Sequence, residues 1–204
     1  MILSEYLLHL FYPKDSFVLL RRRGRHNWLA AGIVLTAVIA ARLFSLFAGN
    51  FLFYGERENV NLLLEVARVL VPFLSFAAAL YAVTSVLGGE TAFRELFTAL
   101  SFSLLPYVLL TVPTALLTWA FSLNEAGFYT ALLAVKWVWI AALGFAGVAQ
   151  LNDYSLSKTA AVFLLSALAA ALLWVSLLLI AVFCVQWIQF FETVISEIQM
   201  LAHR

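Results

Sequence analysis

The chain alternates long apolar runs with short polar segments. Five runs are apolar for close to the ~20 residues that a helix needs to cross a bilayer. They lie at residues 28–47, 66–86, 104–121, 129–149, and from 159 to beyond 180. Backbone groups inside lipid must bond within their own segment, so each run is predicted to be an α-helix. The pattern therefore predicts an all-α fold, a polytopic membrane bundle of five transmembrane helices.

The composition also indicates that the chain lies in a bilayer. Of the 204 residues, 65% are hydrophobic and 11% are charged, whereas a soluble domain carries about 25% charge. A chain with so few polar groups cannot cover its surface with them, so it is expected to lie in a bilayer. The net charge of +1 gives no indication of nucleic acid, and no nucleic-acid partner is predicted.

The first 26 residues are predicted to form a separate cytoplasmic segment, with the five-helix domain over residues 27–204. Apolar residues at positions 7, 8, 10 and 11 precede Pro13, which would break a helix. We expect a short N-terminal interfacial helix on the inner surface. Four arginines between positions 21 and 25 should hold this end in the cytoplasm and, after five crossings, place the C-terminus outside.

This orientation puts two loops, residues 87–103 and 150–158, on the inner side. Gly88 and Gly89 would end the second helix, as glycine commonly does. Apolar residues recur at helical spacing over positions 93–100, which predicts a short interfacial helix leading into the third span. Ser155 or Ser157 would cap the fifth helix. Both loops join an inward helix to an outward one, which makes the two hairpins candidate parallel repeats.

Four ionisable residues, Arg42, Glu65, Arg68 and Lys136, lie within the spans toward their outer ends. Glu65 and Arg68 are three apart on one helix and can pair. Arg42 and Lys136 could approach the same acid from neighbouring helices. One hypothesis is an outward polar pocket that binds an ion or small anion. The favoured alternative is that the long side chains extend along the helix to the interface.

No motif for catalysis is present. The sequence lacks the nucleophile, metalloprotease, phosphate-loop and kinase patterns. His9, His26 and His203 have no partners at metal-binding spacing. We therefore predict no catalytic residue, no metal site and no cofactor, and the chain is not expected to be an enzyme.

Several short motifs carry a family resemblance. They are "YPKDSF" at 12–17, "GGETAFRELFTALSFSLLPYVLLTVP" at 88–113, "EAGFY" at 125–129 and "NDYSLSKT" at 152–159. With five spans and a cytoplasmic N-terminus, the chain resembles the Yip domain (Ypt/Rab-interacting) membrane proteins, and the bacterial and archaeal branch most closely. The resemblance implies an integral protein of the bacterial or archaeal plasma membrane.

The resemblance also makes the two inner loops the signature surface of the family. The residues assigned to this structured inner face are Gly88, Gly89, Thr91, Phe93, Arg94, Asp153, Tyr154, Ser155 and Lys158. A contact between Arg94 and Asp153, one from each loop, is predicted. Eukaryotic members bind prenylated small GTPases through a long cytosolic N-terminal region. The corresponding region here is short, so a GTPase partner is not expected.

Two functions fit these observations. The first is a non-enzymatic membrane adaptor or scaffold, whose partners are the lipid bilayer and other membrane proteins or further copies of itself. The second is a small transporter or channel, or an accessory subunit of one. A transporter should have paired polar groups near the middle of the bilayer. The middle of the first, third and fifth spans is apolar apart from hydroxyls, which favours the scaffold.

Overall fold

The computed structural model describes residues 27–50, 61–121 and 125–202, and within these ranges it is helical with no strand. The helices are α3 (Asn27–Ala48), α5 (Leu62–Val86), α6 (Phe93–Ser103), α7 (Leu105–Leu117), α8 (Ala126–Leu151) and α9 (Leu156–Ala202). Five helical stretches are long and apolar enough to cross a membrane, with α6 and α7 together forming one of them. The predicted membrane bundle of five spans is confirmed. The predicted N-terminal interfacial helix lies outside the described residues.

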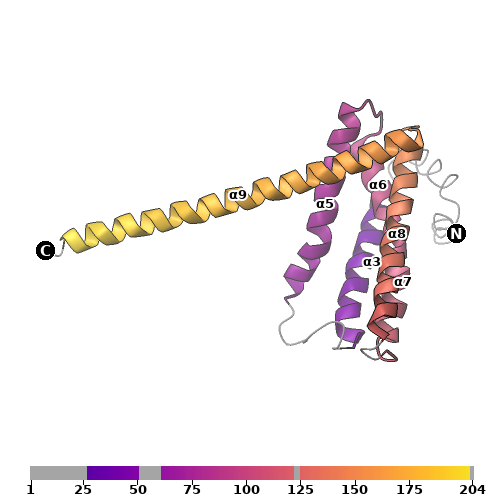
Figure 1. Cartoon of the computed structure of the whole chain (residues 1–204), viewed down its shortest axis with the longest axis horizontal. Helices are drawn as coiled ribbons and strands as arrows, with labels where there is room; N and C mark the ends of the chain where they lie inside the picture. The colour runs from indigo at the N-terminus through magenta and orange to yellow at the C-terminus, as the bar shows by residue number, and fades with distance from the viewer. Residues whose placement is uncertain (1–26, 51–60, 122–124, 203–204) are drawn as a thin grey trace.

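Helix α3, the third span (α6 and α7) and helix α8 form the centre of the bundle. Helix α3 packs against α6 and α7, and these two pack against α8. Helix α5 stands beside them, and α9 crosses α5 and then projects away from the bundle (Figure 1). The ends of α3 and α7 are joined by hydrogen bonds, because Asn50 N donates to Thr118 Oγ1 at 2.9 Å and Trp119 Nε1 donates to Ala48 O at 2.6 Å.

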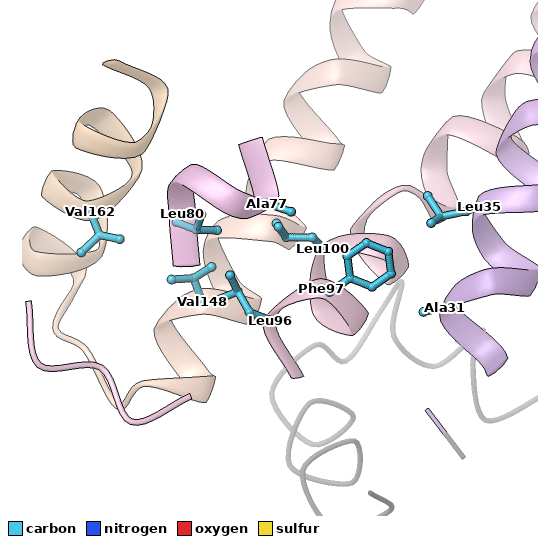
Figure 2. Close-up of a cluster of buried hydrophobic side chains, with 9 residues drawn as sticks. All are labelled: Ala31, Leu35, Ala77, Leu80, Leu96, Phe97, Leu100, Val148 and Val162. Atoms are coloured by element: carbon cyan, nitrogen blue, oxygen red, sulfur yellow. The ribbon is translucent and has the colours of Figure 1, made fainter. Parts of the chain in front are cut away.

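The larger buried cluster joins all the spans at one end of the bundle (Figure 2). Its members are Ala31 and Leu35 of α3, Ala77 and Leu80 of α5, Leu96, Phe97 and Leu100 of α6, Val148 of α8 and Val162 of α9. Lipid tails are as apolar as these side chains, so burial alone gives little advantage in a bilayer. The cluster holds the helices together through close packing.

Helix α6 is a buried part of the third span, and the prediction of an interfacial helix there is wrong. Every residue from Leu96 to Ser103 is buried. The buried hydroxyls bond to their own helix, with Thr98 Oγ1 donating to Arg94 O at 2.7 Å and Ser101 Oγ donating to Phe97 O at 2.8 Å. Because these polar groups are already satisfied, the helix can be buried in the bundle at little cost.

The third span is interrupted between α6 and α7. Leu104 N bonds to Ser101 O at 3.1 Å, and Tyr107 N bonds to Leu104 O at 2.9 Å. Pro106, at the start of α7, has no N–H to continue the helical ladder. The span therefore runs over Phe93–Leu117, rather than over the predicted residues 104–121, and contains a local break.

Helix α9 is 47 residues long, and it packs against α5 and α8. Its first turns pack on the bundle through the buried residues Thr159, Val162 and Ser166. Farther along, Trp174 Nε1 donates to Ser75 Oγ of α5 at 3.1 Å. All side chains from 171 to 193 are exposed. The helix therefore has a long exposed apolar surface, and it projects beyond the bundle (Figure 1).

Candidate functional site

Helix α5 ends in a Schellman motif, in which backbone N–H groups beyond the helix bond back to its last carbonyls. Leu87 N bonds to Val83 O at 3.0 Å, and Gly89 N bonds to Thr84 O at 2.8 Å. Gly88 has φ +76°, a left-handed conformation that glycine adopts without a Cβ clash. The glycine pair thus ends the second span as predicted and turns the chain sharply.

Helix α8 ends in the same way. Tyr154 N bonds to Ala149 O at 3.0 Å, and Asp153 takes the left-handed position with φ 50°. Aspartate is one of the few residues other than glycine that adopts this conformation readily. Ser155 then caps α9, since its Oγ accepts from Lys158 N at 3.4 Å. Of the two predicted caps, Ser155 is the one observed.

The two turns lie against each other and form one surface, which we call the paired-loop face (residues 87–92 and 152–155). Thr91 Oγ1 lies 2.6 Å from Asn152 Oδ1 and 3.2 Å from Leu151 O, and it donates its proton to these acceptors. A Cβ on Gly89 would fall 2.7 Å from the Tyr154 hydroxyl and closer still to Asn152. The loops are therefore fixed by direct contact and by the absence of a side chain at Gly89.

The other predicted inner-face residues surround this contact. Lys158 Nζ lies 4.0 Å from the centre of the Tyr154 ring, a cation–π arrangement. The hydroxyl of Tyr154 is buried, and burial raises the pKa of that group. Phe93 packs its ring against Tyr81 with centroids 5.4 Å apart. The contact between Arg94 and Asp153 stays a prediction.

At the opposite end of the bundle, three of the four predicted ionisable residues form one ion-pair network. Arg42 Nε and Nη2 lie 3.0 and 2.8 Å from Glu65 Oε2. Arg68 Nη1 lies 2.5 Å from Glu65 Oε1. Asn61 caps the start of α5, accepting from Leu63 N at 3.1 Å. The predicted pairing of Glu65 with Arg68, and the approach of Arg42 to the same acid, are confirmed.

Lys136 belongs to the same region but takes different partners. Lys136 is only 5% exposed. The ammonium donates to Thr111 Oγ1 at 3.2 Å and lies 4.5 Å from the centre of the Tyr107 ring. Within the described ranges, no ion pair links it to Glu65. For Lys136 the predicted approach to the acid is wrong, and so is extension to the interface, because the side chain points into the bundle. Arg42, Glu65, Arg68 and Lys136 are called the charged cluster below.

Sequence reasoning did not identify the partners of Lys136. Tyr107 and Thr111 are four residues apart on α7, so they share a face. That spacing marks one face of α7, but it does not identify the helix that packs on this face. Among the residues the structure describes, no group of histidine, cysteine and acidic side chains could hold a metal ion.

Residues 8–188 match the Yip1 domain. No functionally curated protein and no solved structure matches the chain.

Proposed function

The chain belongs to the Yip1 domain family, and from this premise we propose that it is a non-enzymatic membrane adaptor that holds another membrane protein through α9. The observation that carries the proposal is the exposed apolar length of that helix. No charged residue lies between Lys158 and Glu192. None of the residues in its most apolar stretch is buried within the chain.

The length of α9 argues that it does more than cross the bilayer. Its apolar part covers 38 residues, which at 1.5 Å per residue is about 57 Å. The hydrocarbon core is about 30 Å thick. The apolar part of α9 is therefore much longer than a single crossing of the hydrocarbon core requires. A neighbouring transmembrane helix would cover that part.

The far part of α9 also has the residue types of a contact surface. Phe183, Trp187, Phe190 and Phe191 form a set of ring contacts, with Trp187 and Phe183 centroids 5.8 Å apart. All four are exposed, at 48–59%. Aromatic side chains are enriched in protein interfaces because they bury a large area with few rotatable bonds. The partner proposed for this surface is the transmembrane helix of another membrane protein.

The paired-loop face is proposed to be the cytoplasmic side of this adaptor. The proposal follows from the four arginines at residues 21–25, which precede α3 and favour a cytoplasmic N-terminus. Two loops held together by direct hydrogen bonds would give a rigid surface there. Its rigidity would fix the direction in which α9 leaves the bundle.

Co-purification from native membranes tests the adaptor. We expect the wild-type chain to retain a defined membrane protein in mild detergent, and a Trp187→Ala/Phe190→Ala variant to lose it. The matched control is Leu63→Ala/Val138→Ala, which removes apolar side chains that are 81% and 68% exposed on α5 and α8. Equal retention by all three proteins would reject α9 as the docking surface.

A transporter is the second candidate, and a specific observation favours it. The third span is broken at Leu104, and the same span carries Thr111, which binds the buried Lys136. Interrupted helices with polar groups are typical of transport sites. Flux of ions or small solutes in proteoliposomes, reduced by Lys136→Met, would favour this function over the adaptor.

A further inference from the structure

The charged cluster carries more positive than negative charge. Arg42, Arg68 and Lys136 supply three cationic groups, and Glu65 is their one acidic member. These groups lie within α3, α5 and α8, all of which are long and apolar enough to cross a membrane. Uncompensated charge in such a place is costly, so an excess of cations calls for an anion.

Glu65 cannot neutralise the whole cluster. Its Oε2 is occupied by two nitrogens of Arg42, and its Oε1 is occupied by Arg68. Both carboxylate oxygens are therefore already committed to arginine. The residue is 6% exposed, so water contributes little to balancing the charges around it.

Lys136 is the cation of the cluster that has no acidic partner within it. Its contacts with Thr111 and with the Tyr107 ring are to neutral groups. An ammonium has three donors, and Thr111 accepts from one of them. Arg42 lies on α3, which packs against α7, the helix that carries both of these partners of Lys136. A second cation nearby increases the need for a counter-ion.

We propose that the charged cluster binds a phosphate-class oxyanion beside Lys136 and the two arginines. Guanidinium groups and the lysine ammonium are the side chains that bind phosphate in proteins, and arginine presents its donors in a planar fork that matches two oxygens of one anion. The negative charge of a phosphate group is similar in magnitude to the net positive charge of the cluster. This inference does not depend on the adaptor role of α9.

The three cations of the charged cluster differ in how far they are exposed. The side chain of Arg68 is 63% exposed and that of Arg42 is 28% exposed, while Lys136 is buried deeper. The three cations thus range from exposed to buried at one end of the bundle. The phosphate can belong to a lipid headgroup or to a free ion, since both present the same oxygens.

The first experiment uses inorganic phosphate as the probe. The full chain is purified in a detergent and buffer without phosphate, and its Tm is measured against phosphate concentration and against chloride at equal ionic strength. We expect phosphate to raise the Tm by several degrees, because a ligand that binds only the folded state stabilises it. Lys136→Met should lower the apparent affinity at least tenfold.

The second experiment uses lipid as the probe. The chain is placed in nanodiscs of phosphatidylglycerol or of a phosphate-free glycolipid, then extracted, and its bound lipid is counted by native mass spectrometry. A phospholipid retained by wild type and lost in Lys136→Met identifies a headgroup as the source. A response in the first experiment alone identifies the free ion. Either result supports the site.

Matched variants keep the proposal falsifiable. Lys158→Met removes a lysine that also lies over a tyrosine ring, but at the paired-loop face, and it should behave as wild type. Thr111→Val removes the hydroxyl that accepts from Lys136 but leaves every charge of the cluster in place. The proposal is overturned if Lys136→Met and wild type respond alike in both experiments, or if chloride gives the same shift as phosphate.

Discussion

Gly89 lies so close to Asn152 that a Cβ on the glycine would fall 2.6 Å from Asn152 Oδ1 and 2.9 Å from the backbone oxygen of Thr84. We predict that Gly89→Ala destabilises the chain by about 1–3 kcal/mol, the usual cost of forcing extra volume into a packed site. Thermal unfolding in detergent measures it. Gly32→Ala is the control, because a Cβ there would meet nothing within 4 Å. Equal Tm values for the two variants would show that the loops do not pack as described.

The hydroxyl of Thr91 links the two loops, and its removal should loosen the paired-loop face. Thr91→Val keeps the shape of the side chain but removes the donor to Asn152 and Leu151. We expect a loss of about 1 kcal/mol or somewhat more, because buried acceptors are left unpaired. Thr36→Val serves as the control, since the Thr36 hydroxyl is exposed and bonds within α3. Faster hydrogen exchange at residues 87–92 and 152–155 in Thr91→Val alone would confirm the link, and unchanged exchange would contradict it.

Glu65 is the acid on which two arginines converge, so its neutralisation should be costly. Glu65→Gln leaves Arg42 without its carboxylate, and breaking a buried pair in this way costs about 3–5 kcal/mol. The contribution of Arg68 is small, because its side chain is 63% exposed. We therefore expect Arg68→Gln to change the unfolding free energy by less than about 1 kcal/mol. Equal effects of the two substitutions, measured by chemical unfolding in detergent, would contradict the network.

The buried hydroxyl of Tyr154 should make stability depend on alkaline pH. Burial raises its pKa above the ordinary value of 10.0, so the unfolded chain loses this proton before the folded chain does. The folded state is then favoured fully below about pH 10 and less as the pH rises further. Tyr154→Phe should remove this component, so that the variant gains stability relative to wild type between about pH 8 and pH 10.5. A constant difference between Tyr154→Phe and wild type across this pH range would contradict the prediction.

Much of the fold follows from the sequence because the bilayer imposes a simple rule. A segment of apolar residues long enough to cross lipid must be helical, so the presence of five spans could be predicted from hydropathy. The third span nevertheless begins at Phe93 and not at residue 104. The turn at Gly88 also follows from local chemistry, since glycine is favoured in the left-handed position after a helix. The i,i+3 spacing of Glu65 and Arg68 was sufficient to predict their ion pair.

Two features could not be predicted, for physical reasons. The segment at 93–100 has Arg94 and Glu95 at its start, so it looks like a helix at a lipid surface. It is buried because its hydroxyls bond to its own carbonyls, as Thr98 does to Arg94 O, and such bonds are invisible in a hydropathy pattern. The partners of Lys136 depend on how α7 and α8 are rotated against each other, and local sequence does not set that rotation.

Photo-crosslinking in native membranes tests the adaptor most directly. A photoreactive residue is placed at Leu178, which is 64% exposed on α9, and in a second protein at Leu63, which is 81% exposed on α5. We predict that Leu178 forms a discrete adduct with a transmembrane segment of another membrane protein and that Leu63 does not. Adducts from Leu178 that contain only lipid would contradict it.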